Sequence, residues 1–368
     1  MSEKSYLGSN WKLILNIVTL AALALLVYGT RKQLGDTLKN LTHVNAWALL
    51  LMVPIEVLNY HAQAKLYQGM FRIVGNELSY KKLYGASLEL NFVNHVFPSG
   101  GVTGISFFGL RLRNNEITGG RATLIHVMKL GLTFVSFELL LLFGLVALSA
   151  KGHVNNLTIL VAASVTTLLF VATFGFAYIV GSKQRINAFF GAATNGLNKL
   201  IQVVRPKHPE TINVDRARHL FNDFHDNYQV LIGSRQQLKA PFWWALVANL
   251  TEVAAIYVVY IAFGHAVNIG AVILAYAIAN FAGAVSVLPG GVGIYEALMT
   301  AVMASTGVPA GVSLPVTVMY RVVNTLIQIP PGYYLYHKFL RQSNGHLQPA
   351  TVEPTEEYQH QAHHDDTA

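Results

Sequence analysis

Runs of about 20 apolar residues recur along this chain, and they constrain its fold more than any other feature. A helix of that length spans the roughly 30 Å hydrocarbon core of a bilayer. Hydrophobic residues make up 53% of the 368 positions and charged residues only 12%. A soluble domain carries about 25% charged residues, and a disordered chain is poor in apolar ones. The sequence therefore predicts an all-α polytopic membrane protein.

Six apolar runs are long enough to be predicted as full membrane spans. The first is interpreted as an uncleaved helix rather than a signal peptide, because further spans follow it. A polar C-terminal tail, 341–368, is predicted to be disordered. The predicted spans are 13–28, 46–67, 123–148, 157–180, 242–263 and 314–336.

Two further apolar segments, 80–113 and 271–306, are interrupted by proline and glycine. Proline removes a backbone N–H and glycine relaxes φ, so a helix is expected to break at each cluster. We predict a re-entrant hairpin at each break, which brings the chain to about eight apolar segments. The residues that recur in the same order are Asn91, Pro98, Gly100, Gly101 and Gly104 in the first segment and Asn280, Pro289, Gly290, Gly291 and Gly293 in the second.

The distribution of basic residues gives an orientation to these segments. Segment 182–240 carries nine Lys/Arg against four Asp/Glu, so it is placed in the cytoplasm. Both termini then lie in the cytoplasm, and the two hairpins enter from opposite faces. The halves 1–181 and 241–340 form an inverted repeat in this interpretation, with the amphipathic segment packed under the bundle or lying in the headgroup layer. The alternative is that the glycine clusters are only tight packing points between helices.

Several ionisable residues fall inside apolar runs, where an unpaired charge costs at least about 2.5–3.5 kcal/mol. Arg321 lies within the last span, and Glu296 is its expected partner. This pair has two interpretations, a structural ion pair or a site in which the guanidinium binds a phosphate. The complete set is Glu56, His61, Glu89, Lys129, Glu138, Glu252, Glu296 and Arg321.

Known catalytic and cofactor motifs are missing from the sequence. There is no cysteine, which excludes disulfides, thiolate metal sites and a cysteine nucleophile. There is no G-x-S-x-G, H-E-x-x-H or Walker loop, and no soluble basic domain suited to nucleic acid. We therefore expect no cofactor, no resident metal and no nucleic-acid partner.

At this point the residues resemble a known family. The Asn91-Phe92 and Pro98 to Gly101 break, the later run Pro289 to Glu296, and Arg321 in the final span resemble the membrane domain of lysylphosphatidylglycerol synthetases, the multiple peptide resistance factors. The resemblance covers most of the chain to about position 340. It implies a flippase that moves aminoacylated phosphatidylglycerol between leaflets of the cell membrane. In that family a separate soluble domain makes the lipid, and only residues 341–368 follow the membrane domain here.

The sequence thus predicts a lipid flippase-type transporter whose partners are a membrane phospholipid and a separate aminoacyl-lipid synthetase. Pro98 to Gly104 and Pro289 to Gly293 would form its cavity, and Glu296 would position Arg321 and favour a cationic headgroup. Two alternatives stay open: an ion-coupled transporter of a small polar solute, and the family's phosphatidylglycerol lysyltransferase activity, which is not expected of this chain alone. The residues expected to bind the lipid phosphate are Arg111, Arg113 and Arg321, and the candidate ion sites are Glu89, Glu138 and Glu252.

Overall fold

The computed structural model describes residues 44–96, 102–112, 117, 119–149, 156–185, 187–189, 191–192, 228–230, 233–234, 236–285 and 293–342. Within these ranges the regular elements are helices, as the sequence predicts. They are α2 (Ala46–Leu50), α3 (Met52–Ile73), α4 (Tyr80–Val96), α5 (Val102–Leu112), α6 (Gly119–Ser149), α7 (Asn156–Val180), α10 (Lys239–Ala262), α11 (Ile269–Val285), α12 (Ile294–Ser305) and α13 (Ala310–Gln342).

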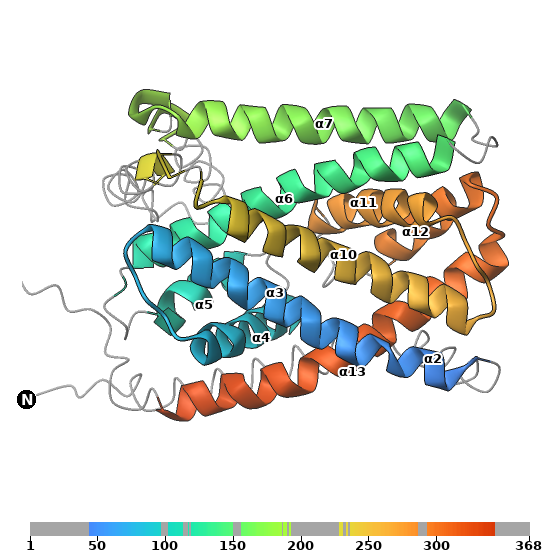
Figure 1. Ribbon diagram of the computed structural model, residues 1–368, viewed down its shortest axis with the longest axis horizontal. Coiled ribbons are helices and arrows are strands. Elements are labelled where there is room, and N and C mark those ends of the chain that lie inside the picture. The colour runs from blue at the N-terminus through green and yellow to red at the C-terminus, as the bar shows by residue number, and fades with distance from the viewer. Residues whose placement is uncertain are drawn as a thin grey trace, which may run out of the picture.

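The long helices run lengthwise through the molecule as a bundle (Figure 1). Helix α3 packs along α10, α4 along α13, and α11 against both α6 and α12. The pair α4–α5 and the pair α11–α12 lie toward opposite ends of the long axis. Both pairs contact α13, which is therefore the element that the two halves share.

Three of the described helices are long and apolar enough to cross a membrane: Arg121–Leu148 within α6, Lys239–Ala262, and Ala310–Gln342. Helix α7 makes a fourth if it is taken together with the short bent helix after it. Exposed side chains such as Phe143 and Phe174 give this part of the bundle an apolar outer surface that suits lipid. The protein is thus an all-helical membrane protein.

Of the other predicted segments, one forms less apolar helices and the rest lie wholly or mostly outside the described residues. Run 46–67 forms α2 and α3, but polar side chains such as Asn59, Gln63 and Lys65 make α3 less apolar than the three spans. Run 13–28, the tail 341–368 after Gln342, and most of segment 182–240 lie outside the described residues.

The described helices end before each proline–glycine cluster and begin again after it. Helices α4 and α5 have 17 and 11 residues, and α11 and α12 have 17 and 12. Each is at or below the lower limit of about 17 residues for a transmembrane helix. Of the break residues themselves, Pro98, Gly100, Gly101, Pro289, Gly290 and Gly291 lie outside the described residues, as does Arg113.

Close backbone contact holds α11 against α6. A Cβ on Gly270 would lie 2.3 Å from the carbonyl oxygen of Gly144 and 3.1 Å from the backbone nitrogen of Leu148. Neither atom belongs to a flexible side chain, so the helices themselves would have to separate. Glycine is thus required here by the approach of two backbones, as in many membrane helix pairs.

Gly270→Ala is therefore expected to destabilise the protein by about 1–3 kcal/mol, the usual range for overpacking. The midpoint of thermal unfolding in detergent micelles, followed by circular dichroism, should fall. The matched control is Gly131→Ala on α6, where an added Cβ meets nothing within 4 Å. An unchanged midpoint for Gly270→Ala would show that the two helices are not in backbone contact.

Candidate functional site

Polar side chains from six helices converge on a cavity of about 200 Å³ inside the bundle. They come from α3, α4, α10, α11, α12 and α13, so both short helix pairs contribute. Amide and phenol groups dominate the lining. The lining residues are Asn59, Gln63, Asn91, His95, Glu252, Tyr276, Asn280, Tyr295, Tyr320, Arg321, Asn324, Thr325 and Gln328.

Helix α13 contributes more of this lining than any other element. Tyr320, Asn324 and Gln328 are spaced by four residues, so they lie on one face of the helix, and Arg321 and Thr325 lie beside them. The rest of the helix is mainly apolar, so this short polar face is turned into the bundle. Its position suits a helix that crosses the membrane beside a polar cavity.

A chain of hydrogen bonds connects this face of α13 to three other helices. Tyr320 donates from its hydroxyl to Glu252 Oε2 (2.8 Å), and Gln328 Nε2 donates to Asn324 Oδ1 (2.7 Å) and to Glu56 Oε2 (2.9 Å). The Gln328 carbonyl oxygen accepts from Asn91 Nδ2 at 2.6 Å. Helix α13 is thereby tied to α10, α3 and α4.

A second branch leads from Glu252 toward α6. Asn59 Nδ2 donates to Glu252 Oε1 at 3.2 Å and to Thr251 Oγ1 at 2.9 Å. Gln63 Nε2 donates to Asn59 Oδ1 (2.6 Å), and its own carbonyl oxygen accepts from Lys129 Nζ (3.2 Å). The two branches join charged groups on three helices through neutral amides and the Tyr320 phenol.

Arg321 and Glu296 form the ion pair that the sequence predicts. Arg321 Nη1 donates to Glu296 Oε1, while Glu296 Oε2 accepts from the backbone N–H of Gly293 at 2.7 Å. Gly293 has φ +90°, which favours glycine, and Glu296 thus closes the N-terminal turn of α12. The Tyr295 ring lies beside the guanidinium, 5.0 Å from the carbon Cζ to the ring centroid. The pair anchors α12 to α13 at the cavity wall.

Arg111, expected to bind phosphate, is paired elsewhere. Its Nε and Nη2 donate to the two carboxylate oxygens of Glu89, at 2.5 and 3.2 Å, and its guanidinium packs over the Phe339 ring at 4.7 Å. Neither Arg111 nor Glu89 lines the cavity. The geometry is that of a structural pair holding α5 to α4 and α13.

Arg111→Ala is expected to lower the stability of the fold by about 3–5 kcal/mol, because the buried Glu89 carboxylate loses its cation. Thermal unfolding in detergent measures the loss. The double variant Glu89→Gln, Arg111→Ala should recover part of it, since no unpaired charge is left behind. If the single and double variants unfold at the same temperature, the pair contributes nothing through its charge.

The remaining predicted residues fall into two groups. Asn91 and Asn280 line the cavity. Gly104 does not, and lies beside the Asn94 side chain within the first helix pair. Glu138 accepts from Thr173 Oγ1 at 2.6 Å, on the side of α6 that meets α7, and is outside the lining.

Apart from Asn91 and Asn280, the uncharged members of the cavity were not predicted from the sequence, chiefly Asn59, Gln63, Tyr320, Asn324 and Gln328. Their four-residue spacing on α3 and α13 was the available signal. In the part of the chain that the structure describes, no group of three or more His, Cys, Asp or Glu side chains is placed to hold a metal ion.

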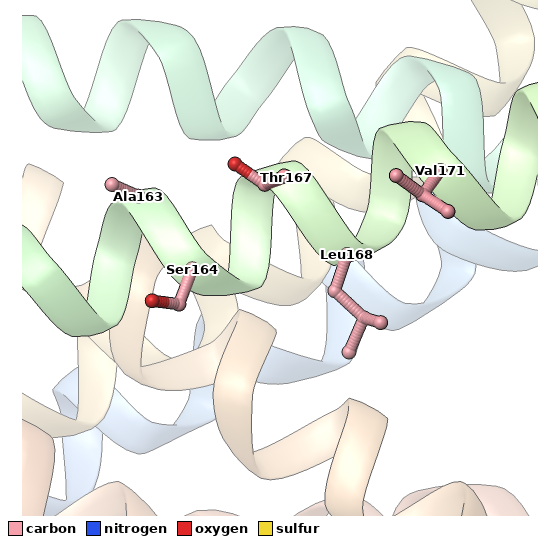
Figure 2. Close-up of a pocket in the computed structure, with 5 residues that line it drawn as sticks. All are labelled: Ala163, Ser164, Thr167, Leu168 and Val171. Atoms are coloured by element: carbon pink, nitrogen blue, oxygen red, sulfur yellow. The ribbon is translucent and has the colours of Figure 1, made fainter.

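A larger hollow, about 470 Å³, lies along α7 (Figure 2). Its five lining residues all project from this one helix, all are exposed, and none is ionisable. Such a surface suits contact with acyl chains rather than recognition of a polar group. The chemistry of the site is therefore assigned to the smaller interior cavity. The five residues are Ala163, Ser164, Thr167, Leu168 and Val171.

The fold and the cavity define a class, a helical membrane protein with a polar, charged cavity between its helices. Within that class the chain belongs to the family described as the lysylphosphatidylglycerol synthase TM region, which it matches over residues 13–332. It is also similar to a UPF0104 membrane protein of Methanothermobacter thermautotrophicus, 32% identical over 83 residues. That match covers 23% of this chain and 25% of the relative's length.

Proposed function

We propose that this protein is a flippase-type transporter that moves a phospholipid with an anionic phosphate, such as a lysylphosphatidylglycerol-like lipid, between the leaflets of the cell membrane. The observation that carries the proposal is the polar cavity between the helices, with Arg321 in its wall. A buried polar surface in a membrane protein is costly unless it serves a ligand or water. At about 200 Å³ the cavity is smaller than the roughly 300–1,000 Å³ of a whole-ligand pocket, which suits a headgroup alone.

The charges of the cavity suit a headgroup that carries both a phosphate and an ammonium group. Arginine binds phosphate through a planar fork of N–H donors, and Arg321, which is paired with Glu296 through Nη1, brings such a guanidinium to the cavity wall. The carboxylate of Glu252 in the same lining suits an ammonium substituent. Phosphate and ammonium together are the charges of an aminoacylated phosphatidylglycerol.

In this proposal the two short helix pairs are inverted re-entrant hairpins that open the cavity to one leaflet at a time. Their position toward opposite ends of the bundle supports it (Figure 1), as does their shared attachment to α13 through Asn91–Gln328 and Glu296–Arg321. If one of these two attachments is broken while the other is kept, the cavity would open to one leaflet. Exchanging the broken and the kept attachment would open it to the other leaflet. The proposed orientation has both termini in the cytoplasm.

The test is a leaflet-resolved assay in proteoliposomes that contain the purified chain. Fluorescent phosphatidylglycerol, its lysyl ester and phosphatidylcholine are introduced, and a membrane-impermeant reductant quenches the probe in the outer leaflet. We expect exchange of the first two lipids to be faster than in protein-free vesicles. Exchange no faster than in protein-free vesicles would refute the proposal.

A second candidate is an ion-coupled transporter of a small polar solute, favoured by the carboxylate of Glu252 in the lining. Uptake of labelled amino acids and sugars into the same proteoliposomes, without lipid exchange, would select it. The family's lysyltransferase reaction is tested separately, by incubating the purified chain with lysyl-tRNA and phosphatidylglycerol. We expect no lysylated lipid unless a separate synthetase is added.

A further inference from the structure

Two carboxyl groups, Glu56 and Glu252, belong to the same interior hydrogen-bond network. The chain Glu252–Tyr320–Asn324–Gln328–Glu56 connects them through three side chains of α13. Glu252 has hydrogen-bond donors on both oxygens, from Asn59 and Tyr320. Glu56 is 1% exposed and has a donor on Oε2 only, while its Oε1 is buried without a hydrogen-bond partner among the described residues.

The charges around this network do not balance. Helix α6 contributes Lys129, which attracts Glu252, whereas the electrostatic effect of Glu252 on Glu56 is repulsive. The other titratable groups facing the two acids are neutral phenols and an imidazole. The arginines of this region pair with other acids, Arg321 with Glu296 and Arg111 with Glu89. The facing phenols and imidazole are Tyr60 of α3, His95 of α4, Tyr276 of α11, Tyr295 of α12 and Tyr320 of α13.

One lysine for two carboxylates leaves one negative charge without compensation. An uncompensated charge in a low-dielectric interior is strongly unfavourable. A headgroup ammonium could reach Glu252, which lines the cavity, but not Glu56, which does not line it and lies behind Gln328. Before a headgroup binds, the second negative charge therefore has no partner. Only a small cation can reach the free oxygen.

We propose that Glu56 and Glu252 form a binding site for one monovalent cation, either a proton or Na⁺, with Oε1 of Glu56 as its principal acceptor. A proton would convert the Glu56 carboxylate to a carboxylic acid, and Na⁺ would be held by carboxylate and amide oxygens. The consequence for transport rests on the proposed function. Gln328 and Tyr320 form hydrogen bonds with the acids and also line the cavity. A headgroup that forms hydrogen bonds with them would therefore change the affinity for the cation, and the cation would change the affinity for the headgroup by the same factor.

Cation binding is tested without lipid, on the purified full chain in detergent. Infrared difference spectra across a pH titration detect a protonated carboxyl, and thermal unfolding in NaCl against choline chloride at equal ionic strength detects Na⁺. We expect one of the two signals in the wild type and its loss in Glu56→Gln, which mimics the neutral carboxyl. Glu138→Gln removes another buried carboxyl, outside the network, and should leave the signal intact.

The second variant is Glu252→Gln, which changes the other carboxyl group of the site. It should weaken the same signal, and it provides the test if Glu56→Gln does not fold. Absence of both the infrared and the Na⁺ signal in the wild type overturns the site. Retention of the signal at full size in a folded Glu56→Gln or Glu252→Gln protein also overturns it.

Coupling is tested in the proteoliposome assay by imposing a pH or Na⁺ gradient. We expect a gradient of the bound cation to accumulate the fluorescent lipid in one leaflet, and Glu56→Gln to abolish that accumulation while exchange without a gradient persists. Equal exchange with and without gradients refutes coupling but leaves the flippase proposal standing. A cation signal in a protein that exchanges no lipid refutes the flippase proposal and leaves the cation site standing.

Discussion

Arg321→Ala is expected to lower the rate of phospholipid exchange about 10- to 100-fold. A hydrogen bond to a charged group contributes about 1.5–3 kcal/mol, and 1.4 kcal/mol corresponds to a factor of ten. The guanidinium is half-buried at the cavity wall, where solvent screens its attraction for phosphate less than on the surface. The measurement is the initial rate at which the fluorescent lipid moves between leaflets, followed by its quenching with the impermeant reductant, in proteoliposomes with matched protein content.

The loss must be separated from misfolding, because Arg321→Ala also leaves the buried Glu296 carboxylate without its cation. The double variant Glu296→Gln, Arg321→Ala removes both charges, so it should fold more stably than the single variant yet transport no better. Arg341→Ala on the exposed end of the same helix is the matched control and should transport normally. Normal exchange by a folded Arg321→Ala protein would remove Arg321 from the substrate path.

The sequence predicted where apolar helices lie because the membrane imposes length and composition directly. Run 123–148 corresponds to α6, Gly119–Ser149, and run 157–180 to α7, Asn156–Val180. Ends are less predictable, since polar and glycine residues extend a helix beyond its apolar run. Thus run 314–336 became α13, Ala310–Gln342, which continues through Pro330 and Pro331.

The candidate site was predictable where a charge or the repeated proline–glycine break marked it, and the break marked Asn91 and Asn280, which line the cavity. Arg321 and Glu296 stood out because a charge in an apolar run requires a partner, and the structure pairs them. Arg111 was predicted to bind the lipid phosphate but is paired with Glu89 instead of lining the cavity. Neutral side chains such as Asn324 and Gln328 cost less to bury than a charge and so mark the site less clearly in the sequence. Whether they converge depends on which faces of α3, α4 and α13 meet.

The packing of α13 against α4 depends on a second close backbone contact, at Gly332. A Cβ on Gly332 would lie 2.6 Å from Phe92 Cβ and 2.7 Å from the carbonyl oxygen of Leu88. The contact lies one helical turn from Gln328, whose carbonyl oxygen accepts from Asn91 of α4. Separating the two helices at Gly332 would therefore also break this hydrogen bond, which joins the first helix pair to α13 at the cavity wall.

Gly332→Leu is accordingly expected to destabilise the protein by at least about 3 kcal/mol, at or above the upper end for overpacking, since the side chain cannot enter without moving α13 from α4. We expect a lower thermal midpoint and a reduced yield of monodisperse protein on size-exclusion chromatography. Gly311→Leu is the matched control on the same helix, because a Cβ there meets nothing within 4 Å. Leucine favours helix over glycine by up to about 1 kcal/mol, so this control should be neutral or stabilising. Equal midpoints for the two variants would mean that α4 and α13 do not pack at Gly332, and the shared anchoring of both helix pairs on α13 would have to be abandoned.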